Sequence, residues 1–330
     1  MAFIRLTIIL LAFFLGIITE YFFVTTAHSS HFPEFFETRK SFGYPMINQL
    51  IDVELPEKSP ENDRLTSFRK DVDKAINRNI NSGRIAAASV YFRDLDKGAW
   101  FSLGSVEQFE PASLMKVPIM IALLRDAEKD PGILRRKVKF AVPEDLYAYQ
   151  RIKPPTLMER GKSYSVDDLL FRMVAYSDND ATYLLEEVVN PATREEVFAD
   201  MKINSPYINP NKEMYISAEE YAAFFRILYN ATYLNKDMSE KALEYLDHST
   251  YKDGLVAGVP PNMVVAHKFG ERSDERDPQI KYLSDCGIVY YPLHPYLLCL
   301  MTRGTDFDAL SGVLQDISRT VYDEVNKHYQ

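Results

Sequence analysis

Three short strings of residues in this sequence carry the side chains that acyl transfer needs. In chain order they are Ser113-Leu114-Met115-Lys116, Ser177-Asp178-Asn179 and Lys268-Phe269-Gly270. The first combines a hydroxyl nucleophile with an amine one helical turn away, the second adds a hydroxyl and an amide, and the third adds an amine at the end of an expected strand. Together they predict an acyl-transfer site in which a lysine takes the proton that a histidine takes in many proteases.

The context of the first string separates it from chance matches. The pattern Ser-x-x-Lys occurs three times, starting at Ser67, Ser113 and Ser249. Only Ser113 leads into an apolar run, at 117–124, that predicts a helix buried on every side. Ser67 lies in a polar stretch typical of an exposed helix, and Ser249 lies in an expected loop. The sequence therefore favours Ser113 as the nucleophile.

The spacing of Ser113 and Lys116 suits proton transfer. Positions i and i+3 share one face of a helix, so we expect the amine to reach the hydroxyl. Burial and a second cation, for which Lys268 is the candidate, both lower the pKa of a lysine, and only a neutral amine accepts a proton. Pro118 does not fit this helix, because a proline beyond the first turn costs a hydrogen bond or causes a kink.

The composition is that of a globular protein with an acidic surface. The 330 residues are 46% hydrophobic and 26% charged, enough for a large core in one or two domains. The net charge of −9 argues against nucleic acid as a partner. The six histidines lack metal-ligand spacing and no glycine-rich phosphate loop is present, so we expect neither a metal nor another cofactor.

The N-terminus carries an apolar run over 6–24, interrupted only by Glu20. It is near the length of about 20 residues that spans a bilayer. We favour an uncleaved anchor, because the run is longer than the core of a usual signal peptide, and the alternative is a signal peptide cut near Ala27. Either exports the rest of the chain. We expect a domain division into 1–26 as anchor or signal peptide, 27–60 as a linker with one ordered segment at 46–55, and 61–330 as the globular domain.

The two cysteines, Cys286 and Cys299, flank an expected hairpin. If Tyr291 pairs with Tyr296, Cys286 faces Met301 and not Cys299. Partners out of register miss the geometry of a disulfide, so two free core thiols are favoured. A disulfide is the alternative in an exported protein.

The remaining patterns predict the order of helices and strands. A helix over 62–80 precedes two strands, at 86–92 and 100–103, and a mostly helical middle runs over 113–246. Three strands at 263–268, 282–291 and 296–302 and a last amphipathic helix at 307–325 follow. This order predicts an α/β (α+β) body in two parts, with the site in the cleft between them.

The three strings resemble those of the penicillin-recognising serine enzymes, most closely the class A β-lactamase-like group. Ser177 follows Ser113 by 64 residues and Lys268 follows Ser177 by 91. Asp180-Ala181 and the run at 254–260 add to the likeness, which covers about residues 62–328. It implies a five-stranded antiparallel sheet flanked by the N- and C-terminal helices, with a helical subdomain of about 106–260 inserted between strands 2 and 3.

The resemblance also implies roles for the motif residues. Ser113 would be the acylated nucleophile, and Lys116 would take or relay its proton. Ser177 would pass a proton to the leaving nitrogen. Asn179 would bind the amide side chain of the substrate, and Lys268 would attract its carboxylate.

Further roles concern the backbone and the structure around these side chains. The N–H groups of Ser113 and Glu271 would form the oxyanion hole. Gly270, which completes the third motif, counts among the substrate-binding residues. Asp178 is expected to be structural, capping or hydrogen-bonding its loop.

The chain departs from the family pattern at two places. Phe269 stands where the family has Ser or Thr, which removes a hydroxyl that binds the substrate carboxylate, and the ring is expected to narrow the cleft or to change the carboxylate accepted. Class A β-lactamases also use a glutamate after the second motif to activate water. The loop at 204–214 offers only Glu213, directly before a helix expected to start near Ser217. The alternative role for Glu213 is that of an acid at a helix N-terminus.

Three functions follow as alternatives. The first is a β-lactamase that opens a β-lactam and hydrolyses the ester. The second is a D,D-peptidase acting on peptidoglycan stem peptides, and the third is a membrane-tethered binding domain without turnover. The intact motifs argue against the third, and the short loop weakens the first. We expect a class A β-lactamase-like serine hydrolase for a β-lactam or a peptidoglycan peptide, facing the outside of the cell as an anchored or secreted protein.

Overall fold

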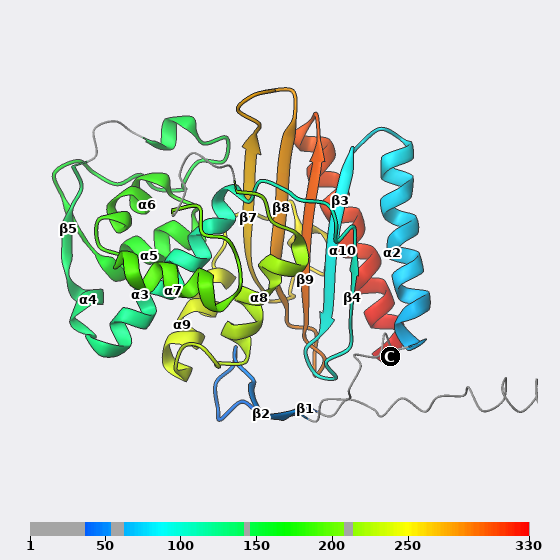
Figure 1. Ribbon diagram of the computed structural model, residues 1–330, viewed down its shortest axis with the longest axis horizontal. Helices are drawn as coiled ribbons and strands as arrows, with labels where there is room; N and C mark the ends of the chain where they lie inside the picture. Colours follow the sequence, from blue (N-terminus) through cyan, green and yellow to red (C-terminus); the bar gives the residue numbers. More distant parts are fainter. Residues whose placement is uncertain (1–36, 54–62, 142–145, 208–213, 330) are drawn as a thin grey trace, which may run out of the picture. The chain divides into compact units, whose positions relative to one another are not determined.

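The structure is a computed structural model that describes residues 37–53, 63–141, 146–207 and 214–329 (Figure 1). The expected anchor or signal segment at 6–24 and the acid Glu213 lie outside these residues. Among the helices in the described ranges, none combines the length and the apolar character that a bilayer crossing requires.

The helices have the following bounds: α2 Asp63–Asn81, η1 Ala112–Met115, α3 Lys116–Lys129, α4 Gly132–Arg135, η2 Leu146–Tyr149, α5 Val166–Ala175, α6 Asn179–Glu186, α7 Pro191–Asp200, α8 Ala218–Tyr229, α9 Lys236–Asp247, η3 Leu255–Gly258 and α10 Phe307–Tyr329. The strands are β1 Glu37–Lys40, β2 Gln49–Val53, β3 Ala87–Asp94, β4 Trp100–Leu103, β5 Lys137–Lys139, β6 Ser163–Ser165, β7 Val265–Ser273, β8 Lys281–Val289 and β9 Tyr296–Gly304.

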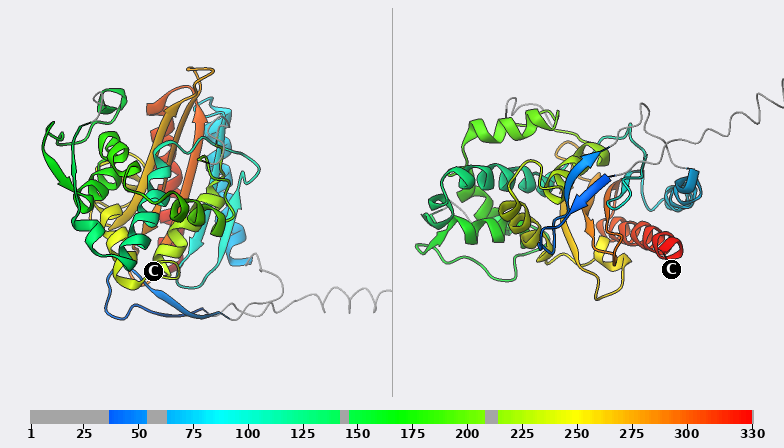
Figure 2. Two further views of the ribbon diagram at one scale, coloured as in Figure 1. Left: turned by 60° about the vertical axis from the view of Figure 1, so that its left-hand side comes forward. Right: turned by 90° about the horizontal axis from the view of Figure 1, so that it is seen from below.

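Five strands form one antiparallel sheet in the order β4-β3-β9-β8-β7, which confirms the expected sheet. Helices α2 and α10 pack on each other, and α10 packs on β8 and β9, while α8 packs on β3, β8 and β9 from the other side (Figure 2). Strands β8 and β9 are buried along almost their whole length, because helices cover both faces. Strand β7 is an edge strand, and its neighbours outside the sheet include α9, η1 and η3.

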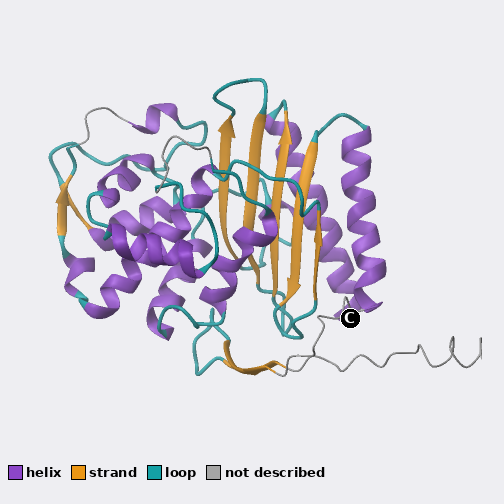
Figure 3. Ribbon diagram, viewed as in Figure 1, coloured by secondary structure: helices purple, strands orange, loops and turns teal. Residues whose placement is uncertain are grey.

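The helical part is built around α3 (Figure 3). Its residues from 116 to 124 are all buried, as expected, and it packs on α5, α7 and α9. Ser217 and Glu220 form a reciprocal capping box at the start of α8, which satisfies two backbone N–H groups there. This confirms the helix expected near Ser217.

The structure explains Pro118, which the sequence left as a misfit. The α-helix begins only at Lys116, after the 3₁₀ turn η1, so Pro118 lies in its first turn, where a backbone N–H has no partner within the helix. The carbonyl of Leu114, which Pro118 cannot bond, accepts the hydroxyl of Tyr221 at 2.7 Å. The expected loss of a hydrogen bond is therefore compensated from α8.

The expectation of two free thiols is wrong, because Cys286 and Cys299 form a disulfide. Val289 pairs with Tyr296, which shifts the register by two residues from the expected one and places the two cysteines opposite each other. Strand β8 ends before Tyr290, whose N–H bonds to the carbonyl of Val264, directly before β7. The connection to β9 is thus longer than the tight turn that the expected register assumed.

The ordered part of the expected linker is larger than 46–55. Strands β1 and β2 pair as an antiparallel ribbon. The segment between them buries Met46 and Ile47, whose N–H groups donate to the carboxylate of Glu240 on α9 at 2.8 and 2.9 Å. The ribbon is therefore tied to the helical part by hydrogen bonds to a buried carboxylate.

Candidate active site

A close backbone contact brings the first and third motifs together. A side chain on Gly270 would lie 2.5 Å from the carbonyl oxygen of Pro111 and 3.1 Å from the N–H nitrogen of Leu114, so only glycine permits this approach. Turn η1, which carries Ser113, consequently packs against the free edge of β7. This is the position that the acyl-transfer interpretation requires.

Two buried amines converge on the hydroxyl of Ser177. The Nζ of Lys116 lies 3.2 Å from this oxygen, 2.6 Å from the carbonyl oxygen of Ser177 and 2.7 Å from Oδ1 of Asn179. The Nζ of Lys268 donates to the same hydroxyl at 2.9 Å and to the carbonyl of Phe269 at 2.8 Å. The fold thus gathers Lys116, Ser177, Asn179 and Lys268 from three separate parts of the chain.

The surroundings of both lysines disfavour their charged forms. Burial lowers the pKa of Lys116 to about 7, although the carboxylate of Asp178 acts in the opposite direction. Burial, together with the neighbouring Lys116, holds the pKa of Lys268 well below its usual value, against the effect of Asp285 and Glu271. Two ammonium groups on one hydroxyl repel each other, so the pair gives up a proton readily.

The acceptors around Lys116 fit a neutral amine. The carbonyl oxygens of Ser177 and Asn179 can only accept hydrogen bonds, so they take two N–H groups of Lys116. The remaining lone pair of the neutral amine is then free for a hydroxyl proton. Lys116 can therefore act as a proton acceptor near pH 7.

Ser113 lies half-buried in η1. Among the described residues no hydrogen bond joins its hydroxyl to Lys116, whose amine bonds Ser177 and Asn179. The expected proton transfer between Ser113 and Lys116 stays a prediction. Ala112, directly before Ser113, has a φ of 48°, and Ser177 has a φ of 55°. Such left-handed conformations are strained for residues other than glycine and tend to cluster at functional sites.

The pairing of β7 with β8 leaves the backbone N–H of Glu271 without a partner in β8. In an antiparallel pair, every second residue bonds to the neighbouring strand. Tyr290 donates to Val264, and Asp274 donates to Ile280, so the even-numbered residues of β7 are those bonded to β8. The N–H of Glu271 consequently points away from β8, toward the edge where η1 packs. This is the direction needed for the predicted oxyanion donor.

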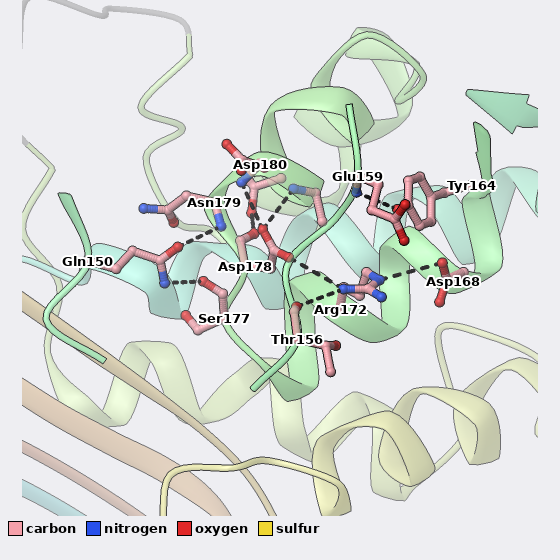
Figure 4. Close-up of polar contacts among 12 residues, drawn as sticks. Gln150, Thr156, Glu159, Tyr164, Asp168, Arg172, Ser177, Asp178, Asn179 and Asp180 are labelled. Atoms are coloured by element: carbon pink, nitrogen blue, oxygen red, sulfur yellow. Dashed lines mark hydrogen bonds and ion pairs between the residues drawn. The ribbon is translucent and has the colours of Figure 1, made fainter. Parts of the chain in front are cut away.

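Polar contacts behind the second motif hold it in place (Figure 4). Asp178 caps α6 by accepting the N–H groups of Asp180 and Ala181 at 2.9 and 3.1 Å, as expected for a structural residue. Gln150 bonds the carbonyl of Ser177 and the N–H of Asn179, both at 3.0 Å. The sequence carried no signal for Gln150, because it belongs to no motif and lies in a separate segment of the chain.

Phe269 does not line an open cleft. Its ring is 2% exposed and stacks on Tyr251 with the ring centres 4.4 Å apart. The ring is therefore packed in the core, and its expected effect on the cleft or on the carboxylate accepted stays a prediction.

The two other Ser-x-x-Lys patterns form no such cluster. Ser67 and Lys70 are both exposed on α2, and Ser249 is buried while Lys252 is exposed. Neither serine therefore has a buried amine of its own motif beside it, which leaves Ser113 as the candidate.

Comparisons with known proteins agree on the architecture. A model of the beta-lactamase enzyme family matches residues 70–325. The solved structure of PBP-A is 23% identical with a TM-score of 0.66 and covers 83% of this chain and 100% of that chain. An acyl-enzyme complex of a PBP-A mutant with penicillin G is 22% identical with a TM-score of 0.64, again covering 83% of this chain and 100% of that one.

A beta-lactamase from Sphaerobacter thermophilus is 18% identical with a TM-score of 0.65 and covers 78% of this chain and 97% of that one. No curated protein sequence matches the chain. At these identities the solved structures show the shared fold, while the family match extends over most of the sheet and the helical part. The chain therefore belongs to the beta-lactamase enzyme family, among the penicillin-recognising serine hydrolases.

Proposed function

We propose that the protein forms an acyl-enzyme through Ser113 on the amide carbonyl of a β-lactam and then hydrolyses this ester. The observation that carries the proposal is the hydroxyl of Ser177 held between two buried amines, 3.2 Å from Lys116 and 2.9 Å from Lys268. Buried lysines with lowered pKa values supply a proton acceptor without a histidine.

The proposed acylation moves one proton around the cluster. Neutral Lys116 takes the proton of the Ser113 hydroxyl while its oxygen bonds to the carbonyl carbon. The N–H groups of Ser113 and Glu271 stabilise the oxyanion, and each such donor is worth roughly 3–4 kcal/mol in comparable enzymes. Ser177 then gives its proton to the leaving nitrogen as the C–N bond breaks, and Lys116 returns a proton to Ser177.

The hydrogen bonds already made restrict how the substrate binds. Oδ1 of Asn179 is taken by Lys116, so Asn179 offers its N–H₂ group to the acyl side chain of the substrate. When Lys116 is neutral, the remaining proton of the lysine pair is assigned to Lys268, which then attracts a substrate carboxylate. Gly270 leaves room for η1 and the substrate at the edge of β7.

The second candidate is a D,D-peptidase that acylates Ser113 with peptidoglycan stem peptides. It is favoured by the short connection between α7 and α8, whose only acid is Glu213. A β-lactamase needs a base for the water that attacks the ester. Without such a base, a β-lactam adduct persists.

A fluorescent penicillin tests the site. We expect it to label the full chain covalently and Ser113→Ala to abolish the label, while Ser67→Ala, in the exposed motif on α2, labels like the wild type. Equal labelling of Ser113→Ala would overturn the assignment. The mass of the intact adduct over time separates the two candidates: loss within seconds indicates a β-lactamase, and persistence for hours indicates a peptidase.

We also propose that the domain works outside the cytoplasm, anchored or released at its N-terminus. The apolar run at 6–24 and the disulfide between Cys286 and Cys299 support this, because disulfides persist in oxidising compartments. A membrane-impermeant penicillin should label intact cells as strongly as lysed ones. Labelling restricted to lysed cells contradicts export.

A further inference from the structure

The segment formed by η2 and the residues after it is bonded to the side of the site that the second motif forms. The side chain of Gln150 bonds the backbone of both Ser177 and Asn179 (Figure 4). The N–H of Leu146 donates to Oδ1 of Asp180 on α6 at 2.8 Å. These are contacts to the first turn of α6 and to the residues before it, so the segment is fixed to the helical wall.

The next two residues reach the opposite wall. Nε of Arg151 lies 2.7 Å from Oε2 of Glu271, and the N–H of Ile152 donates to Oε1 of the same carboxylate at 3.2 Å. Glu271 belongs to β7, so residues 150–152 connect the helical wall directly to the edge strand. The guanidinium of Arg151 also lies 4.9 Å from the ring centre of Phe307 at the start of α10.

The contact that Arg151 makes with Glu271 breaks more easily than the hydrogen bonds that Gln150 makes with the second motif. Gln150 holds backbone groups of the second motif, whereas Arg151 holds a side chain and is itself 41% exposed. The side chain of Glu271 is only 12% exposed, so its carboxylate loses its cation at a cost when Arg151 moves away. Residues 150–152 thus form a bridge between Asn179 and Glu271. The Arg151–Glu271 contact is the part of this bridge that can open, and opening it is unfavourable.

The position of this bridge bears on the acyl side chain of a substrate. In the proposed function, which this inference rests on, the scissile carbonyl lies at the N–H of Glu271 and the acyl side chain lies toward Asn179. Residues 150–152 connect these same two residues. A large group on the acyl side therefore meets the bridge.

We propose that Arg151 and Glu271 determine which substrates the site accepts, by closing its acyl-side end with an ion pair. The substrate class is acyl donors with a slender side chain next to the scissile carbonyl. Bulky, branched acyl groups are disfavoured because they displace Arg151 and leave the carboxylate of Glu271 without its cation.

Two penicillins with the same ring nucleus test this pair: benzylpenicillin, with a slender acyl group, and methicillin, with a bulky dimethoxybenzoyl group. The measurement is the second-order rate of Ser113 acylation, followed by intact mass. In Arg151→Ala we expect the methicillin-to-benzylpenicillin ratio of rates to rise about tenfold. Glu271→Gln, which keeps the backbone N–H, should raise the same ratio. Arg135→Ala removes an exposed arginine on α4 and should leave the ratio unchanged.

An unchanged ratio in both variants, with Ser113 still acylated, overturns the selectivity role and leaves the proposed function standing. A rise in Arg151→Ala alone overturns the ion pair as its cause. Failure of both penicillins to acylate the wild-type chain sinks the proposed function and this inference together. Thermal unfolding of each variant shows whether it is folded, and Glu271→Gln provides the test if Arg151→Ala is not.

Discussion

Strand β7 buries polar side chains on both faces, and the two faces satisfy them differently. Toward η3, Nδ1 of His267 lies 2.8 Å from Oδ1 of Asp285, whose other oxygen accepts the N–H of Leu255 at 2.9 Å. Toward the helical part, Lys268 shares the hydroxyl of Ser177 with a second lysine. The burial is the same, but the partners are not.

The difference separates structure from chemistry. A buried acid with a complementary partner and a backbone donor is stabilised in place, which suits a core contact. Two buried amines that face neutral oxygens and each other are instead pushed toward their uncharged forms, as the pKa of about 7 for Lys116 shows. Strand β7 thus contributes His267 to a structural pair on one face and Lys268 to the proton-transfer cluster on the other.

Of the changes considered, removal of Lys116 should have the largest effect, because it takes the proton acceptor away from the lysine cluster. We expect Lys116→Ala to slow acylation of Ser113 by roughly 10²–10⁴-fold, the usual contribution of a general base. The measurement is the rate of adduct formation by intact mass. Lys70→Ala is the matched control, because Lys70 is exposed and belongs to the Ser-x-x-Lys pattern that starts at Ser67. A loss of less than tenfold in Lys116→Ala would contradict the role of Lys116.

Removal of Asp285 should destabilise the fold, because it removes the buried contact with His267 on the other face of β7. We expect Asp285→Ala to lower the free energy of unfolding by about 3–5 kcal/mol, because it leaves His267 and the N–H of Leu255 without a partner in the core. Urea denaturation measures the change. Asp316→Ala removes an exposed ion pair with Arg84 and should cost about 0–1 kcal/mol. Equal losses in the two variants would show that burial of the Asp285 pair does not matter.

The pH dependence of the acylation rate tests the protonation state of Lys116, and the expected effect is smaller than that of the two substitutions above. Lys116 must be neutral to accept a proton, so the rate should rise with pH around a midpoint near 7 and level off above it. Asp178 raises the pKa of Lys116, so Asp178→Asn, which can still cap α6, should move the midpoint to lower pH. A midpoint near 10, the ordinary value for lysine, is the result that excludes Lys116 as the base.

Local chemistry made much of the fold predictable. The capping residues before α6 and α8, the apolar run of α3 and the alternation of the strands act over a few neighbouring residues, so their patterns are complete in the sequence. The three motifs were likewise visible in the sequence, and the fold brings the amines of Lys116 and Lys268 to the hydroxyl of Ser177. The catalytic role of Ser113 stays a prediction.

Contacts between distant segments were decided only by the tertiary structure. A register shift of two residues turned two expected thiols into a disulfide, because a strand pattern specifies which face a side chain takes but not which residue lies opposite. Gln150 and Arg151 belong to no motif and became part of the site because their segment packs between α6 and β7.

The sequence by itself therefore determined which residue types could perform the chemistry and on which kinds of element they lie. The tertiary structure alone decided that the amine of Lys116 bonds the second motif and not Ser113, and that Phe269 packs on Tyr251. The physical reason is range. Helix caps and alternation depend on near neighbours, whereas these partners lie 18 or more residues apart and meet only through the packing of the whole core.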